Sequence, residues 1–304
     1  IKSRAGDRVV KGLTAITHPR DVTPRSGDFI ILTVKSSQTQ SSVQSLREAF
    51  PEDTPLVCMQ NGVRNEEIAA GRFLHVYGGM LGISATFLEP GVVAHTRGEL
   101  LSIGNYPLGC DNTGRKIAAE FEKAGFKTMT HESIMAVKWS KLILNLNNAT
   151  FAIIDKHLQL GLVTPAISKF MADVQEEGLR ALNVARISLE DQNNPFDPKR
   201  HLAELRSVVE DHEKINAEAN SPMEFRTYPS TWMDLKLKRG ETEAGYFNGE
   251  IILLGEKHGV PTPYNSTLFI IVETMAAKGA QPGLYNIEDL ANLVERRRRE
   301  LDEW

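Results

Sequence analysis

Asp28-Phe29-Ile30-Ile31-Leu32-Thr33-Val34 is the stretch that decides the fold of the first part of this chain. Its apolar residues follow one another without alternation, which is typical of a strand buried on both faces of a parallel sheet. A helix is predicted across residues 39–50, and Pro51 ends it. Pro55-Leu56-Val57-Cys58-Met59 repeats the pattern, and a second helix begins near Arg64. Strand, helix, strand and helix at this spacing indicate a βαβ unit and hence an α/β domain.

Further strands are predicted on both sides of this unit. Residues 1–20 contain short alternating segments typical of a hairpin that leads into a sheet. Residues 73–104 are predicted as antiparallel or edge strands separated by turns. These strands are expected at 74–77, 83–87, 92–95 and 100–103, with turns at Glu89-Pro90-Gly91 and Arg97-Gly98. A helix capped by Asp111 and a last strand at 126–130 follow.

The chain changes character near His131 and Glu132, because helical periodicity dominates from Ser133 onward. We therefore predict one domain over residues 1–131 and an all-helical domain over residues 132–304. No Pro-, Gly- or Ser-rich linker separates the two, so they are expected to pack directly on each other. Predicted helices of the second domain include 165–186, 202–217, one that carries Tyr246 to Leu254 and stops at His258-Gly259, one ending at Ala277, and 287–304.

The composition excludes several classes of protein. The chain has 304 residues, with 41% hydrophobic and 24% charged residues, which is ordinary for a soluble globular protein with a sizeable core. The formal net charge of -4 gives no signature of nucleic-acid binding or of an acidic membrane surface. No apolar run is long enough to span a bilayer. Cys58 and Cys110 cannot form a disulfide framework, which suits a reducing cytosol, so we predict a cytoplasmic protein.

A polar line within an apolar helix is the first candidate site. In the stretch from Trp139 to Asn148, Lys141, Asn145 and Asn148 fall at i, i+4 and i+7 and share one helix face. Two interpretations stay open at this point. The face is simply solvated, as is common for lysine and asparagine, or it is a site lysine supported by amides and facing a cleft.

Several motifs together resemble the ketopantoate reductase (2-dehydropantoate 2-reductase) family, in matching order and spacing over nearly the whole chain. They are Val34-Lys35 at a strand end, Gln60-Asn61-Gly62, Lys141-Leu142-x-x-Asn145, Ser230-x-x-x-Asp234, Arg239-Gly240-x-Thr242-Glu243-x-x-Tyr246-x-Asn248-Gly249 and His258-Gly259-Val260-Pro261-Thr262-Pro263. The resemblance implies a Rossmann-type NADP-binding domain and a helical domain similar to the C-terminal domain of 6-phosphogluconate dehydrogenase. It also implies reduction of a 2-keto acid to a 2-hydroxy acid by hydride transfer from NADPH, and a homodimer formed through the helical domain.

The resemblance also implies roles for individual residues. Lys141 would be the general acid, and a cation there suits the charge that develops on the substrate oxygen. Glu243 would pair with Lys141 or with a substrate hydroxyl. The remaining roles would be Asn145 and Ser230 at the substrate, Ser230 at its carboxylate, Asn61 near the nicotinamide, and Lys35 near the adenosine 2′-phosphate. No metal ligands are predicted.

Simpler structural roles fit some of these residues equally well. Asn61-Gly62 is a common turn signal. Glu243 suits the start of a helix, where the helix dipole favours a carboxylate. Ser230 suits a helix cap after Pro229, and it can serve both purposes.

Two departures from the family pattern carry expectations of their own. No Gly-x-Gly-x-x-Gly follows a first strand, although dinucleotide binding uses such a loop. Because the chain also begins at Ile1 rather than Met, we expect that it is processed or lacks an upstream strand, loop and helix. Ala149 stands where the family commonly has a second asparagine, so Asn148 is expected to substitute, and a keto acid related to ketopantoate stays open.

Two alternatives to a 2-keto acid reductase stay open. The first is a binding protein of this family that lacks catalysis or cofactor, and an absent upstream Gly-rich segment would favour it. The second is a 3-hydroxy acid dehydrogenase of the wider two-domain family. The run from Thr242 through His258-Gly259 argues against the second alternative.

Overall fold

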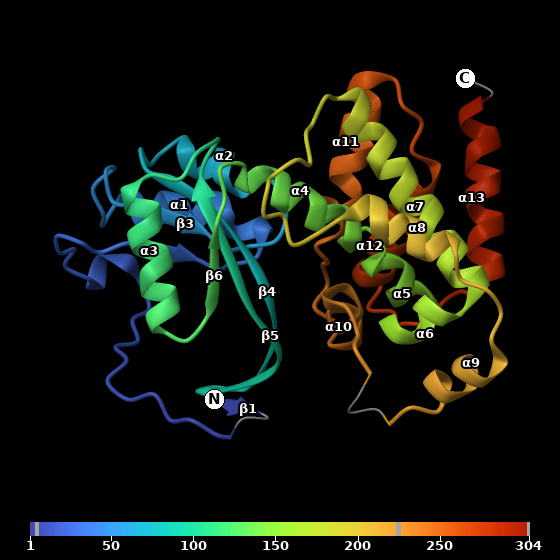
Figure 1. The fold of residues 1–304 in the computed structure, drawn as a ribbon, viewed down its shortest axis with the longest axis horizontal. Helices are drawn as coiled ribbons and strands as arrows, with labels where there is room; N and C mark the ends of the chain where they lie inside the picture. Colours follow the sequence, from blue (N-terminus) through green and yellow to red (C-terminus); the bar gives the residue numbers. More distant parts are fainter. Residues whose placement is uncertain (4–5, 223–225, 303–304) are drawn as a thin grey trace. The chain divides into compact units, whose positions relative to one another are not determined.

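The computed structural model describes residues 1–3, 6–222 and 226–302, and the chain divides into two compact units (Figure 1). The first unit contains Ile1–Trp139 and Leu189–Pro195. The second contains Ser140–Ser188 and the chain from Phe196 onward. Helix α4 (Ile134–Asn145) therefore contributes its first half to one unit and its second half to the other.

The two apolar runs of the first unit form neighbouring parallel strands, as the sequence predicts. They are β2 (Ile30–Leu32) and β3 (Leu56–Cys58), paired in register from Ile30–Leu56 to Leu32–Cys58. Within the described residues, six strands form one mixed sheet in the order β1-β5-β4-β3-β2, with β6 also paired to β5. The other strands are β1 (Lys2–Ser3), β4 (Val76–Glu89), β5 (Val92–Asn105) and β6 (Lys127–Thr130).

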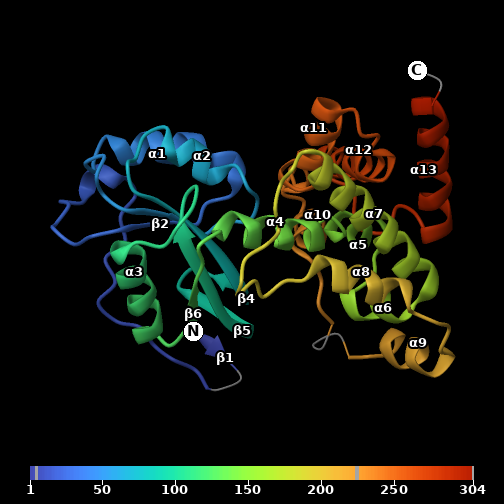
Figure 2. The ribbon, with the colours of Figure 1, turned by 45° about the horizontal axis from the view of Figure 1, so that its top comes forward.

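Helices cover both faces of this sheet. Successive side chains of a strand point to opposite faces, and those of β3 are apolar on both. Leu56 and Cys58 pack in the core shared with α1 (Thr39–Arg47) and α2 (Asn65–Ala70). Val57 and Met59 pack in the core shared with α3 (Asn112–Lys123), which Asp111 caps as predicted. Figure 2 shows α1 and α2 on one side of the strands and α3 on the other. The first unit is therefore Rossmann-like, as predicted from the family resemblance.

Two details of the predicted strands are wrong. Residues 76–105 form one long hairpin of β4 and β5 rather than four short strands, and only the predicted turn after Glu89 exists. The predicted turn at Arg97-Gly98 lies inside β5, opposite register shifts near Gly82 and Ser84. A Cβ on Gly98 would lie 2.0 Å from the Gly82 carbonyl oxygen, so glycine permits the close approach of two strands here.

The predicted hairpin within residues 1–20 is also absent from the described part of that segment. β1 pairs in parallel with β5 instead. Residues 6–18 are irregular, and the short helix η1 (Pro19–Asp21) follows them. The pattern was misleading because short alternating runs indicate a strand but do not identify its partner.

The second unit is helical, as predicted. Its helices after α4 are α5 (Asn148–Ile154), α6 (Leu158–Val163), α7 (Pro165–Val184), α8 (Pro198–Arg206), α9 (His212–Ala219), α10 (Ser230–Lys236), η4 (Ala244–Tyr246), α11 (Asn248–His258), α12 (Pro263–Ala277) and α13 (Ile287–Asp302). The predicted helix 202–217 is in fact α8 and α9, because Asp211 caps a new helix by accepting a hydrogen bond from the Lys214 amide. Gly259 ends α11 in the left-handed conformation, as predicted.

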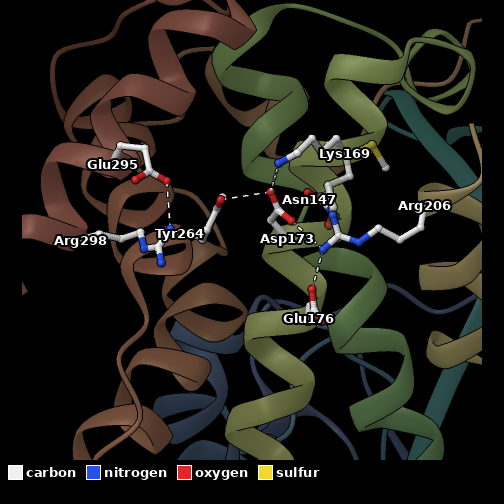
Figure 3. Close-up of polar contacts among 9 residues, drawn as sticks. Asn147, Lys169, Asp173, Glu176, Arg206, Tyr264, Glu295 and Arg298 are labelled. Carbon is white, nitrogen blue, oxygen red and sulfur yellow. Dashed lines mark hydrogen bonds and ion pairs between the residues drawn. The ribbon is translucent and has the colours of Figure 1, made fainter. Parts of the chain in front are cut away.

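Helix α7 is the centre of the second unit. Its apolar side includes the buried residues Ile167, Phe170 and Val174. On its polar side, Asp173 accepts a hydrogen bond from Tyr264 on α12 and pairs with Arg206 on α8 (Figure 3). One carboxylate therefore joins three helices. Across the helices that the structure describes, none has the length and apolar character needed to cross a membrane.

Candidate active site

Two loops of the first unit lie side by side at the carboxyl ends of β2 and β3. Half-buried Lys35 follows β2 and precedes the short helix η2 (Ser36–Gln38). Half-buried Asn61 follows β3. The Ser36 hydroxyl donates a hydrogen bond to the Asn61 carbonyl oxygen at 3.1 Å. The structure thus joins the loops that carry these two predicted cofactor residues, at the edge of the sheet where ligands of such folds bind.

A buried polar network fixes the turn that carries Asn61. The Asn65 side-chain amide donates to the Asn61 carbonyl oxygen at 2.8 Å, and its oxygen accepts from the Thr39 hydroxyl at 2.7 Å. The Gln60 amide donates to Thr39 Oγ1 at 2.9 Å. Because every member of this chain except Asn61 is buried, its hydrogen bonds are shielded from competing water.

Lys138 also contacts this turn. Its Nζ donates to the Gln60 carbonyl oxygen at 3.1 Å and to the carboxylate of Glu66. The Lys138 side chain is 3% exposed and the Glu66 side chain is fully buried. Burial raises the pKa of Glu66, although the attraction of Lys138 opposes that change.

The polar line of the second unit differs from its prediction as one continuous helix. Helix α4 ends at Asn145 and α5 begins at Asn148, so Leu146 and Asn147 form a turn between them. Lys141 and Asn145 share α4, whereas Asn148 is the first residue of the next helix, and all three side chains are half-buried. Ala149, at the position where the family commonly has asparagine, is buried.

Hydrogen bonds to distant segments stabilise this break. The Asn248 side-chain amide donates to the Leu146 carbonyl oxygen at 3.0 Å and to Asn265 Oδ1 at 2.9 Å. The Asn147 side-chain amide donates to the Met171 carbonyl oxygen at 3.1 Å. The Asn248 donor satisfies a backbone carbonyl at the break, and the Asn147 side chain joins the turn to α7.

A buried carboxylate completes the support. Glu177 on α7 accepts hydrogen bonds from the Tyr264 and Asn265 backbone amides, at 3.0 Å and 2.8 Å, and from the Asn265 side chain. It therefore caps the start of α12, where a helix dipole favours negative charge. Burial raises the pKa of Glu177 and outweighs these hydrogen bonds. A polar chain runs from Glu177 through Asn265 and Asn248 to the turn between Asn145 and Asn148.

The other predicted site residues lie on separate elements of the second unit. Glu243 is buried and directly precedes η4. Ser230 is exposed and is the first residue of α10, which packs on α5. Its predicted cap is not formed by its side chain, since Pro229 is the residue that precedes the helix. Other residues of the family motifs have structural contacts. The Thr242 hydroxyl donates a hydrogen bond to the Glu273 carboxylate, and Asp234 forms an ion pair with Arg239 at 2.7 Å.

Sequence reasoning did not find the supporting residues Lys138, Glu66, Glu177 and Asn265. One feature of the sequence could have indicated that Lys138 is buried. It is a lysine inside the apolar segment 134–139, one helical turn before Lys141. Glu66 and Glu177 lie in helices beside other carboxylates, Glu67 and Glu176, and a sequence does not show which member of such a pair is buried.

Comparisons with known proteins agree with this architecture. Residues 1–107 match the family model "Ketopantoate reductase PanE/ApbA", and residues 133–276 match the model of its C-terminal domain. A 2-dehydropantoate 2-reductase from Pyrococcus horikoshii is 28% identical over 255 residues, covering 83% of this chain and 77% of the relative.

Solved structures are similar as well. A PanE/ApbA family ketopantoate reductase from Ralstonia eutropha JMP134 has a TM-score of 0.73 and 25% identity, covering 91% of this chain and 84% of that one. D-mandelate dehydrogenase in complex with NADH has a TM-score of 0.68 and 25% identity, covering 83% of this chain and 80% of that one. The chain belongs to the ketopantoate reductase family of oxidoreductases.

Proposed function

We propose that the protein reduces a 2-keto acid, either 2-dehydropantoate or a close relative, to the 2-hydroxy acid with NADPH. The observation that carries this proposal is the half-buried Lys141 on α4, followed by a braced turn between Asn145 and Asn148. The similar proteins named 2-dehydropantoate 2-reductase support the reaction class. The motif residues stand in this chain in the order that the family has.

The loops after β2 and β3 have the chemistry that a nicotinamide cofactor requires. Lys35 supplies a cation for the 2′-phosphate of NADPH, and Asn61 supplies an amide for the nicotinamide end. Gln60 Oε1 is buried and has no hydrogen-bond partner within the described structure, so this turn also has an acceptor to offer. The bound reduced cofactor supplies the hydride for the keto carbon.

Lys141 would supply the proton. As hydride adds to the carbonyl carbon, negative charge develops on the carbonyl oxygen, and an ammonium group stabilises this charge before it donates its proton. The lysine is left neutral and regains a proton from water after product release. Glu243 would pair with Lys141 or with a substrate hydroxyl.

The remaining polar residues would bind the substrate. Asn145 and Asn148 present amides on either side of the braced turn, and Ser230 would hold the carboxylate. Because Ala149 provides no amide, a substrate that needs two asparagines spaced four residues apart would bind less well. This favours testing relatives of 2-dehydropantoate beside 2-dehydropantoate itself.

The direct test is consumption of NADPH by the full-length protein with a panel of 2-keto acids, with identification of the product. We expect 2-hydroxy acid formation in amounts equal to the NADPH consumed. Absence of turnover with every 2-keto acid, in a protein that is folded, would overturn the proposal.

A second cofactor candidate is NADH, because the similar D-mandelate dehydrogenase was solved with NADH. The Lys35→Ala variant separates the two. If Lys35 holds the 2′-phosphate, the variant raises KM for NADPH by about tenfold, and KM for NADH stays unchanged. Equal effects on both cofactors would contradict this role of Lys35.

A further inference from the structure

The buried ion pair of Lys138 and Glu66 has no place in the proposed chemistry. The two residues lie 72 positions apart in the sequence, on α4 and α2, and both side chains are buried. Replacing a buried pair by apolar residues of similar volume is often neutral or stabilising. Stability alone therefore does not account for a lysine and a glutamate at these positions.

The contact that distinguishes Lys138 is its hydrogen bond to the Gln60 carbonyl oxygen. Gln60 directly precedes Asn61, and the Asn61 carbonyl oxygen is held by Ser36 and Asn65. The two successive carbonyl groups of the turn are thus fixed by three buried donors. Lys138 supplies the only charged donor among these three, and an ammonium group makes a stronger hydrogen bond than a neutral donor.

The helix that carries Lys138 is itself seated closely on the sheet. Gly78 and Gly104 are paired across β4 and β5. A Cβ on either glycine would lie 2.9 Å from a side-chain atom of Ile134, the first residue of α4. The missing side chains therefore let this end of α4 approach the sheet. The position of Lys138 relative to the turn is set by backbone packing as well as by its own side chain.

We infer that Lys138 is a positioning residue, which holds the Gln60–Asn61 turn so that Asn61 meets the nicotinamide end of the cofactor. This inference rests on the proposed function. Glu66 has a different part, because it is the buried counter-ion of Lys138 and accepts its second hydrogen bond. Loss of the Lys138 donor releases the turn, whereas loss of the Glu66 charge alone leaves that donor in place.

Two variants separate positioning from simple stabilisation. Glu66→Gln removes the counter-ion and keeps the donor to Gln60. It should therefore lower the free energy of unfolding while the Gln60–Asn61 turn stays held. Lys138→Met combined with Glu66→Leu removes both charges and keeps an apolar core, so it retains more stability but leaves the Gln60 carbonyl oxygen without Lys138. The matched control is Lys123→Met with Glu120→Gln, an exposed Lys–Glu pair on α3 of the same unit.

The measurements are thermal unfolding and KM for NADPH with the best keto acid. We expect the double variant at positions 66 and 138 to be the more stable of the two, yet to show about a tenfold rise in KM for NADPH, larger than that of Glu66→Gln. The control pair should change neither quantity. If KM instead follows the order of stability, Lys138 acts only as a structural residue and the inference is wrong.

Hydrogen exchange gives a readout that does not depend on turnover. Backbone amides of residues 59–65 should exchange faster in the double variant than in Glu66→Gln. If the wild-type protein reduces no 2-keto acid but this order of exchange holds, the proposed function fails and the hold of Lys138 on the turn stands. If turnover is present and residues 59–65 exchange equally in both variants, the inference fails and the proposed function stands.

Discussion

The two units support their candidate site segments by the same kind of contact but with donors of different charge. In the first unit, the charged Lys138 donates to the Gln60 carbonyl oxygen. In the second, the neutral Asn248 donates to the Leu146 carbonyl oxygen. A charged donor needs a buried counter-ion, whereas an amide needs only one further acceptor, here Asn265. Two hydrogen bonds of the same kind therefore differ in what their loss costs. Removing the partner of a buried charge lowers the free energy of unfolding more than removing the partner of a neutral amide.

The largest effect is expected from Lys141→Ala, because it removes a proton donor rather than a support. We expect kcat to fall by about a hundredfold or more, with the unfolding midpoint unchanged. The matched control is Lys257→Ala, which removes an exposed lysine of α11. Full turnover in the Lys141 variant would show that Lys141 is not the proton donor.

Asn248→Ala tests the neutral support. It leaves the Leu146 carbonyl oxygen and Asn265 Oδ1 without their shared donor, so we expect a loss of about 1–3 kcal/mol in the free energy of unfolding. KM for the keto acid should rise while KM for NADPH stays the same. Urea unfolding and steady-state kinetics measure both, with exposed Asn216→Ala as the control. A change confined to KM for NADPH would contradict the assignment of this support to the substrate side.

Acid should weaken the first unit before it weakens the support in the second. In the first unit, Asp191 accepts hydrogen bonds from His131 and from the Ser133 and Asn193 amides, which lower its pKa although burial opposes them. Its stabilising contribution is present above the unfolded pKa of about 4 and is lost as pH falls through the lowered value. For Glu177, burial raises the pKa, so its contribution is lost as pH rises instead.

Hydrogen exchange against pH, corrected for intrinsic rates, measures this difference. Residues 131–133 and 189–195 should lose protection below about pH 4 while the start of α12 keeps it. In Asp191→Asn, the acid dependence of the first region should flatten. Simultaneous loss of protection in both regions would show that these two carboxylates do not set the order.

The smallest effect is expected from Glu295→Ala on α13. Glu295 and Arg298 form a pair whose side chains are about half exposed, at 51% and 52% (Figure 3). Exposed pairs contribute about 0–1 kcal/mol, so the unfolding free energy should change by less than about 0.5 kcal/mol. A larger loss would show that the surface pairs of the second unit are as important as its buried amide chain.

The sequence predicted those parts of the fold whose signals are local. The continuous apolar runs gave β2 and β3, the aspartate cap gave the start of α3, and Gly259 gave the end of α11. Local signals also caused the errors. Arg97-Gly98 is typical of a turn, but Gly98 lies inside β5 opposite register shifts in β4, and its environment depends on Gly82 across the hairpin.

The supports of the candidate site could not be predicted, because their partners are distant in the chain. Asn248 meets Leu146 across 102 positions, and Lys138 meets Gln60 across 78. The polar residues from Lys141 to Asn148 were found from their helical spacing, but that spacing does not show the break between Asn145 and Asn148, which Asn248 supports from another helix. The assigned roles of all the candidate site residues stay predictions, as does the homodimer; these residues are Lys35, Asn61, Lys141, Asn145, Asn148, Ser230 and Glu243.

The most direct test of the central claim follows the hydride itself. The full-length protein is given NADPH deuterated at C4 of the nicotinamide and 2-dehydropantoate or a relative, and the product is examined by mass spectrometry and NMR. Our account predicts a 2-hydroxy acid that carries deuterium at C2 when the transferred face is labelled. A product without deuterium from either labelled face, or no product at all, would contradict it.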